Sequence, residues 1–252
     1  MEQSGSDRKI YYIKMFPVRT VSEREVLGVP IVQLSLVEVL AWIRVPLPPV
    51  YPTRARTVCL VNALSVVEAN RNPQHMAALK DADVCLADGM GVALLARTPK
   101  IAGADLMLAA ARHPKLGKMR HVLLGGFGVA YDAAHRQWWE AGILPVHKPW
   151  IPDTPAHDDL VEWANGVPCD ILWIALGCPK QERWMQKNRH RLRAKVIIAV
   201  GAAFDMLAGR TSRAPGWMRP IGLEWAWRIH QEPLRWRRQV DAAVGFLRLL
   251  CR

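Results

Sequence analysis

The chain has 252 residues, which is long enough for one large domain with a buried core. Apolar residues make up 51% of it and charged residues 22%, a composition that excludes a largely disordered chain. The 34 Lys and Arg against 22 Asp and Glu leave a net charge of +12, which favours an anionic partner: nucleic acid, an acidic membrane surface or a phosphorylated substrate.

The five cysteines and the histidines, His75 among them, show no metal-ligand spacing, and no CxxC pair occurs. Scattered cysteines of this kind favour a reduced, cytoplasmic setting. No run of about 18 uncharged apolar residues occurs, so we expect no transmembrane helix and only peripheral membrane contact. Residues 1–14 are polar and charged, unlike a secretory signal.

Residues 1–26 are expected to form an irregular, basic segment. A short strand at 29–31 follows, and then a helix. Ser35 as N-cap with Glu38 three residues later is the capping-box pattern that starts such a helix. Residues 45–52 are a proline-rich connection.

From residue 57 onward, short apolar runs alternate with helical segments. Strands are predicted at 57–62, 84–87, 121–124, 170–176 and 196–200, and helices at 63–80, from 89 onward and at 129–141. Strands that alternate with helices predict an α/β fold with a parallel, Rossmann-like sheet flanked by helices. We expect this core to span residues 27–205.

Residues 206–252 are predicted to form an Arg/Trp-rich helical appendage that associates with a membrane. From Asp205 to the end there are nine Arg and no Lys, against four acidic residues. Arg binds phosphate and carboxylate through two parallel hydrogen bonds and stacks on aromatic rings. Beyond Pro233, apolar residues fall at helical spacing on one face: Trp236, Val240, Ala243, Val244, Leu247 and Leu250.

Polar or glycine residues close all five predicted core strands. Ligands of parallel sheets bind at the carboxyl ends of the strands, so these residues are the candidates for a site. They are Asn62, Asp88-Gly89, the run 125–128, the run 177–182 and the run 201–205.

Asp88 is the sharpest single candidate, because it follows an apolar strand and precedes Gly-Met-Gly. A free aspartate is ionised at neutral pH, so it can act as general base toward a hydroxyl. The alternative is a helix N-cap worth about 1 kcal/mol.

Two further strand ends carry weaker signals. Gly125 and Gly126 belong to a glycine-rich turn that either cradles a phosphate or simply turns the chain. Gln181 and Glu182 either hold sugar hydroxyls or cap the helix that follows them. The pair Asp81 and Asp83 has the D-x-D form of a metal site, but it precedes its strand and so belongs at the opposite end of the sheet.

Taken together and in order, the motifs resemble the WecG/TagA/CpsF glycosyltransferases (glycosyltransferase family 26) over roughly residues 27–245. The motifs are Asn62, Ala87-Asp88-Gly89-Met90-Gly91, Gly103-Ala104-Asp105-Leu106, the run 177–182, the run 201–205, Arg213-Ala214-Pro215 and Gly222-Leu223-Glu224-Trp225.

This resemblance implies an inverting hexosyltransferase that moves a sugar from a UDP-sugar to a polyprenyl-diphosphate-linked saccharide in bacterial cell-surface or exopolysaccharide synthesis. The donor would be UDP-glucose, UDP-N-acetylmannosamine or its uronic acid. The enzyme would lie peripherally on the cytoplasmic face of the inner membrane, with its appendage on the anionic surface. No metal or cofactor is expected, and a homo-oligomer is left open.

The resemblance assigns the general base to Asp88. It places the family's essential C-terminal arginines at Arg213, Arg219 or Arg228, where we expect them to bind a diphosphate. Other substrate contacts are expected from Asn62, Gly89, Lys100, Asp105, Gly125, Gly126, Gln181, Glu182, Phe204 and Asp205. Two residues depart from the family pattern. Leu60 replaces a Thr, which removes a hydroxyl, and Lys100 replaces an Arg, which keeps the charge but not the planar fork.

Two other functions fit parts of this pattern. A nucleic-acid-binding protein would account for the charge and the Arg/Trp tail through phosphate contacts and base stacking, but not for polar residues at the strand ends. A catalytically silent membrane scaffold of the same assembly pathway would share the fold without the reaction.

Overall fold

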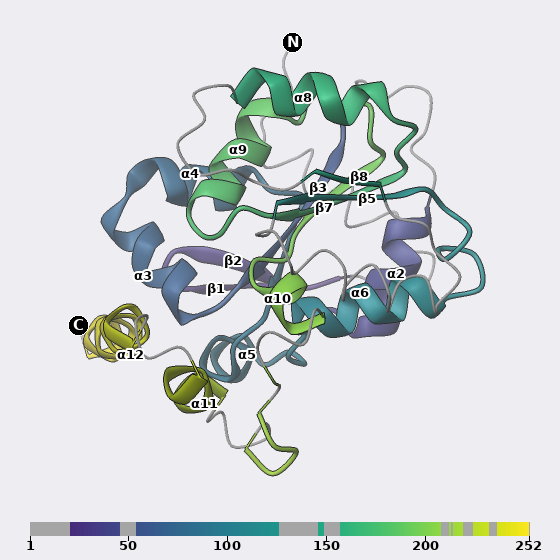
Figure 1. Ribbon diagram of the computed structural model, residues 1–252. Helices are drawn as coiled ribbons and strands as arrows, with labels where there is room; N and C mark the ends of the chain where they lie inside the picture. The colour runs from purple at the N-terminus through teal and green to yellow at the C-terminus, as the bar shows by residue number, and fades with distance from the viewer. Residues whose placement is uncertain are drawn as a thin grey trace.

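The computed structural model describes residues 21–45, 54–125, 146–148, 157–207, 212, 214–218, 224–231 and 236–251. Within these ranges, six parallel strands form one sheet in the order β4-β3-β8-β7-β5-β6 (Figure 1). The strands are β3 (Arg56–Val61), β4 (Val84–Ala87), β5 (His121–Gly125), β6 (Val146–Lys148), β7 (Ile171–Ala175) and β8 (Val196–Ala199). The predicted α/β fold is confirmed. The helix predicted at 129–141 lies outside the described residues.

Helices cover both faces of this sheet. One face is packed by α3 (Ala63–Arg71), α4 (Pro73–Asp81), α8 (His157–Gly166) and α9 (Lys180–Asn188), and the other by α2 (Leu36–Arg44), α6 (Gly103–Arg112) and α10 (Ala203–Leu207). Figure 1 shows α8 and α9 above the strands and α6 and α10 below them. Leu172 and Ile174 enter the first core, and Ile171 and Trp173 the second. Burial on both faces explains why the strands are continuous apolar runs.

A separate antiparallel hairpin is made by β1 (Glu23–Val26) and β2 (Val29–Val32). Leu27 and Gly28 both have positive φ at its turn, as a tight hairpin with right-handed strand twist requires. The strand predicted at 29–31 is confirmed, but β1 occupies residues that were predicted to be irregular. Most of its side chains are exposed, so its sequence lacks the alternation of apolar and polar residues that predicts a strand. Its strand conformation is stabilised by pairing with β2.

The helix starts follow their caps. The predicted capping box at Ser35 is present: the Ser35 side chain accepts from the Glu38 N–H, and Glu38 Oε2 accepts from the Ser35 N–H. The single helix predicted at 63–80 is wrong, since α3 ends at Arg71 and α4 begins at Pro73. Proline disfavours the helical conformation of the residue before it, and Asn72 is extended and caps α4 instead.

The D-x-D pair is a structural feature at the amino end of β4, as its position in the sequence indicates. Asp83 is 2% exposed and accepts a hydrogen bond of 2.8 Å from the Thr57 N–H. It also forms ion pairs with Arg54 and with the buried Arg189. These partners compensate the buried carboxylate charge, which would otherwise be strongly unfavourable.

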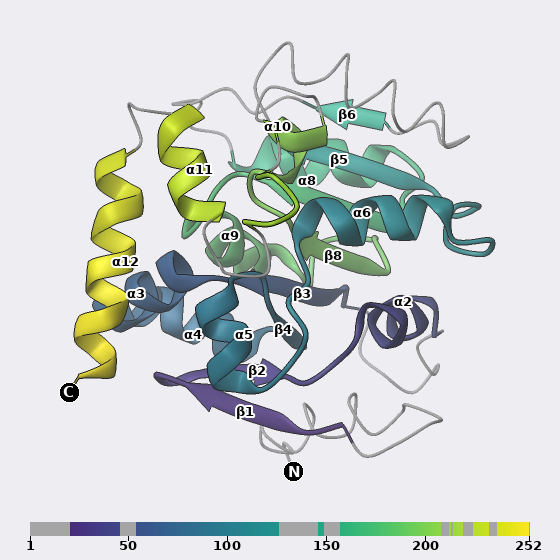
Figure 2. The same ribbon diagram turned by 90° about the horizontal axis from the view of Figure 1, so that it is seen from below.

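The C-terminal part contains α11 (Glu224–Gln231) and α12 (Trp236–Leu250), and α12 lies alongside α3 (Figure 2). Ala242 and Phe246 of α12 are buried, and Gly245 lies so close to Val67 that an added Cβ would be 3.0 Å from its Cγ1. Within the described ranges, no helix is both long and apolar enough to cross a membrane.

The outward side of α12 carries the apolar face that its sequence predicts. Its exposed large hydrophobic side chains are Trp236 (46%), Val244 (40%), Leu247 (62%) and Leu250 (42%). The helix therefore has two apolar sides, one packed on the core and one facing away from it.

Candidate active site

Asp88 and Asn62 follow neighbouring strands, β4 and β3, at the carboxyl edge of the sheet. Val61 and Ala87 are register partners, and the Asp88 N–H donates to the Val61 carbonyl oxygen at 2.9 Å. The N-cap of α5 (Met90–Ala96) is Gly89, so Asp88 stands one residue before the position of a capping aspartate. The N-cap position is thus a glycine, and the half-buried Asp88 side chain lies at the strand end.

Asn62 caps α3, because its Oδ1 accepts from the Ser65 N–H at 3.2 Å. A Cβ added to Gly89 would lie 3.3 Å from the Asn62 Cβ, so the two strand-end loops touch and leave little room for a side chain at position 89. The expected substrate contacts of Asn62 and Gly89 stay predictions, but the residues are adjacent to Asp88 as those contacts require.

The segment that follows α5 returns to the same edge. The Ile101 N–H donates to the Ala87 carbonyl oxygen at 2.7 Å, and α6 begins at Gly103 against the end of β8, where an added Cβ would lie 3.0 Å from the Val200 oxygen. Asp105 is half-buried in the first turn of α6. Lys100 forms an ion pair with Glu224 of α11, which ties this edge to the C-terminal helices.

Gly125 ends β5 with a φ of 108°, in the region that favours glycine. A Cβ there would lie 2.6 Å from the Ala175 carbonyl oxygen, so the close approach of β5 and β7 also requires glycine. These two constraints account for Gly125 without a ligand. Gly126 lies outside the described residues.

Gln181 and Glu182 begin α9 and are buried, at 3% and 1% exposed. The Gln181 side chain accepts from the Gly201 N–H at 3.2 Å and donates to Glu182 Oε1 at 2.8 Å. Gln181 thus links the ends of β7 and β8. Burial raises the pKa of Glu182 to about 7, and the hydrogen bond from Gln181 opposes this increase. Their expected contacts with sugar hydroxyls stay predictions.

The remaining predicted site residues follow β8 in the sequence. Phe204 belongs to α10 and is buried in the core, and Asp205 beside it is half-buried. Arg228 is part of α11, and its side chain lies outside the described part of the structure, as do Arg213 and Arg219. The Arg238 side chain of α12 donates to the Cys178 carbonyl oxygen, so the appendage also touches the loop after β7.

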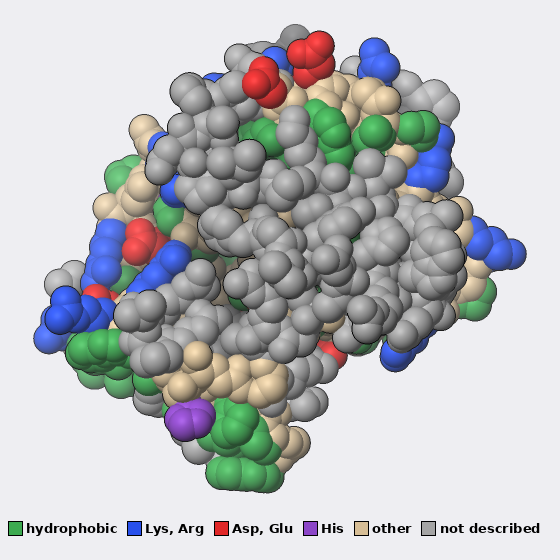
Figure 3. Space-filling model, in the orientation of Figure 1, with side chains coloured by type: hydrophobic (Ala, Val, Ile, Leu, Met, Phe, Trp, Pro, Cys, Tyr) green, Lys and Arg blue, Asp and Glu red, His purple; other side chains and the backbone are tan. Residues whose placement is uncertain are grey.

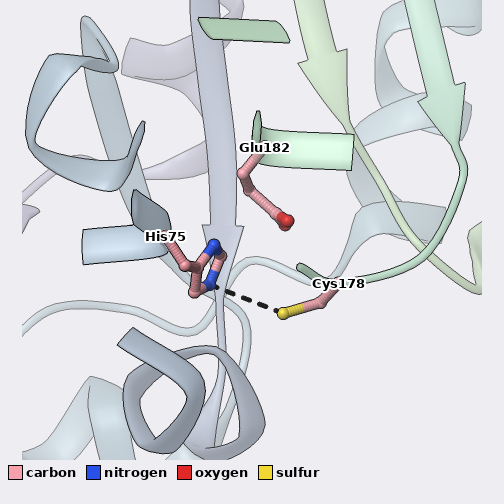
Figure 4. A group of neighbouring side chains, drawn as sticks. All are labelled: His75, Cys178 and Glu182. Carbon is pink, nitrogen blue, oxygen red and sulfur yellow. Dashed lines mark hydrogen bonds between the residues drawn. The ribbon is translucent and has the colours of Figure 1, made fainter. Parts of the chain in front are cut away.

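Sequence reasoning missed a side-chain group formed by His75, Cys178 and Glu182 (Figure 4). His75 comes from the first turn of α4 and Cys178 from the loop after β7. One ligand atom of each residue lies within 4.8 Å of the other two. Burial raises the pKa of Cys178 and lowers the pKa of His75 to about 4, so both are held uncharged. A separation of 103 residues between His75 and Cys178 leaves no spacing pattern to find.

Comparison with known proteins shows the family to which the chain belongs. Residues 24–252 match the Glycosyl transferase WecG/TagA/CpsF family. The chain is 30% identical over 184 residues, 69% of this chain and 70% of the relative, to the N-acetylglucosaminyldiphosphoundecaprenol N-acetyl-beta-D-mannosaminyltransferase of Bacillus spizizenii (strain ATCC 23059 / NRRL B-14472 / W23). It is 26% identical over 198 residues, 73% of this chain and 75% of the relative, to the protein of the same name from Bacillus subtilis (strain 168). The chain belongs to the WecG/TagA/CpsF family of glycosyl transferases.

Proposed function

We propose that this chain transfers a sugar from a UDP-sugar to a saccharide carried on a polyprenyl diphosphate, with inversion at the anomeric carbon. The family membership supports glycosyl transfer, and the names of the two Bacillus relatives support an acceptor on a polyprenyl diphosphate. N-acetylmannosamine is the first donor sugar to test for the same reason. The observation that carries the proposal for this chain is Asp88 at the end of β4, followed by Gly89, which packs against Asn62, and by Gly91, which packs against Phe246.

The Asp88 carboxylate would accept the proton of the acceptor hydroxyl as that oxygen attacks the anomeric carbon. The bond from this carbon to the β-phosphate oxygen breaks on the opposite side of the sugar, and UDP leaves. Arg213, Arg219 and Arg228 would bind the diphosphate and stabilise its developing charge through paired hydrogen bonds. This division of labour needs no metal ion for the reaction.

The appendage would hold the enzyme at the membrane that contains its acceptor. On the outward side of α12, the exposed Trp236, Leu247 and Leu250 lie on a helix that also carries exposed Arg237 and Arg248. Figure 3 shows hydrophobic and basic side chains gathered side by side where α12 lies in Figure 1. A helix with apolar and cationic side chains binds in the plane of an anionic bilayer surface. We infer a peripheral position on the cytoplasmic face of a bacterial inner membrane.

The deciding experiment measures UDP release from a panel of UDP-sugars, with and without a short polyprenyl-diphosphate N-acetylglucosamine acceptor, in a chelator. Release that requires the acceptor and occurs with one donor would support the reaction class and identify the sugar. Release with no donor across the panel would contradict the proposal and favour a catalytically silent scaffold. Acceptor-dependent release that disappears in the chelator would contradict the metal-independent route alone.

A further inference from the structure

The side chains of His75, Cys178 and Glu182 converge from two parts of the chain: α4 and the stretch 178–182 that leads into α9. Figure 4 shows the Glu182 carboxylate pointing toward the space beside the His75 ring and the Cys178 sulfur. The His75 ring and Glu182 are 0% and 1% exposed, and Cys178 is half-buried. Imidazole, thiolate and carboxylate are the three side-chain types that bind zinc in proteins.

The spacing of the group suits a metal ion. Cys178 Sγ lies 3.6 Å from His75 Nε2. Two ligands on a tetrahedral zinc ion with a Zn–S bond of about 2.3 Å and a Zn–N bond of about 2.0 Å are separated by roughly 3.5 Å. A weak thiol-to-imidazole hydrogen bond produces a similar distance, so this distance alone does not decide. The Glu182 oxygen lies within 4.8 Å of both atoms and needs a shift of about 1 Å to complete the geometry.

A second observation points to a missing ligand. In the part of the chain that the structure describes, Glu182 Oε2 has no hydrogen-bond partner, although it is buried. A buried polar atom without a partner costs about 1–3 kcal/mol, more if it is charged. The other carboxylate oxygen, Oε1, is held by Gln181, which fixes the direction in which Oε2 points.

The surrounding charge is compatible with a divalent cation. Arg238 and Arg183 are the nearby cations, and both make hydrogen bonds elsewhere, to the Cys178 carbonyl oxygen and to Gln74. Glu68 adds a negative charge near Cys178. A zinc ion bound by a thiolate, a carboxylate and a neutral imidazole has no net charge, which suits a buried position.

We propose that His75, Cys178 and Glu182 form a zinc-binding site. The three residues supply three ligands, and water would take a fourth position. The ion would join α4, the loop after β7 and α9 beneath the carboxyl edge of the sheet. This proposal departs from the sequence-based expectation that the cysteines and histidines hold no metal, and it gives the ion no step in the transfer reaction.

The test uses the full chain without an affinity tag, stripped of metal by a chelator. Titration with Zn²⁺ against a coloured competing chelator should show one ion bound per chain. Titration with Co²⁺ should show the thiolate-to-cobalt charge-transfer absorption that indicates a cysteine ligand. Failure of the wild-type chain to bind either ion in a saturable way would overturn the proposal without any variant.

Variants then identify the ligands. Cys178→Ser keeps the size of the side chain but removes the thiolate, and it should abolish the cobalt band and weaken zinc binding at least about 100-fold. Glu182→Gln should weaken binding while the band remains. The matched control is Cys251→Ser, at an exposed free cysteine on the far end of α12, which should change neither. Wild-type affinity in a folded Cys178→Ser, or loss of binding in Cys251→Ser, would place the metal elsewhere and overturn the assignment.

Discussion

The ring of Phe246 lies directly against Gly91, so that a Cβ added to this glycine would be 3.1 Å from Phe246 Cε1. Gly91 is the second glycine after Asp88, and Phe246 belongs to α12 near the end of the chain. The C-terminal helix therefore packs on the first turn of α5, directly after the loop that carries the proposed base. This aromatic contact connects the position of α12 to the strand-end site.

Replacing Phe246 by alanine should loosen α12 from the core. The ring is 6% exposed, and truncation of a buried phenylalanine costs about 3–5 kcal/mol. Native-state hydrogen exchange should show the amides of α12 opening more easily by about that amount, up to complete local release. Leu247→Ala, at a side chain that is 62% exposed, is the control and should leave exchange unchanged. Equal protection of α12 in both variants would show that Phe246 does not hold the helix.

Asp88→Asn should reduce the rate of sugar transfer at least about 100-fold, because an amide cannot accept the proton of the acceptor hydroxyl. Binding of UDP should change little, since Asp88 is assigned to the acceptor and not to the diphosphate. The measurements are acceptor-dependent UDP release and calorimetric titration with UDP. Asp159→Asn, at an exposed carboxylate on α8, is the control. Transfer by Asp88→Asn at more than a few per cent of the wild-type rate would remove Asp88 from the role of base.

Asp170 should make folding stability depend on pH. Hydrogen bonds from the Arg120 side chain are the main cause that lowers the pKa of Asp170, and the Arg120 N–H and Lys195 lower it further. Because the folded pKa is lowered, this stabilisation is present above the unfolded pKa of about 3.9 and is lost as pH falls below it.

Urea unfolding at about pH 7 and about pH 3 measures how much the ionised Asp170 contributes to the free energy of unfolding. Asp170→Asn should lower the free energy of unfolding by about 1–3 kcal/mol at neutral pH. At about pH 3 this loss should be smaller by about 1 kcal/mol, because the unfolded carboxylate is then mostly protonated while the folded one stays ionised. The Asp159→Asn chain should keep the wild-type difference between the two conditions. An equal loss at both pH values in Asp170→Asn would mean that packing, not charge, is responsible.

The outward side of α12 should carry membrane binding. Leu247→Ser combined with Trp236→Ser should weaken partitioning onto anionic vesicles at least about tenfold, because both exposed side chains would otherwise enter the interface. The unfolding midpoint should stay constant, since neither is in the core. Val37→Ser, 75% exposed on α2, is the matched control for loss of an exposed apolar residue. Undiminished vesicle binding by the double variant would assign the contact to another surface.

The buried strands were predictable because their residues are apolar without interruption, and β4 was predicted at its observed bounds, 84–87. The break between α3 and α4 could also have been predicted. Asn72 is a favourable N-cap residue, and Pro73 is favoured at the first position of a new helix but not within a continuing one. The prediction of one helix gave more weight to composition than to this local signal. The strand β1 had no signal of its own, because its partner strand supplies its stability.

The site was only partly predictable, for a different reason. Position at a strand end follows from the fold, so Asp88 and Asn62 were placed together correctly. Contacts between side chains from distant segments cannot be predicted from the order of strands and helices. Lys100 pairs with Glu224, and Leu60 is 5% exposed in the core, where a Cβ on Gly103 would lie 3.1 Å from its Cδ1. The replacement of Thr by Leu60 is thus accommodated by apolar packing against α6.

The two apolar sides of α12 have a consequence for engineering. Phe246 and Ala242 pack against the protein interior, whereas Leu247, Leu250 and Trp236 face outward and are exposed. The outward residues can therefore be exchanged as a set without disturbing the core, while the inward residues keep α12 packed on α3 and on Gly91. The two sides of this one helix can therefore be changed independently, the inward side with an effect on stability and the outward side without one.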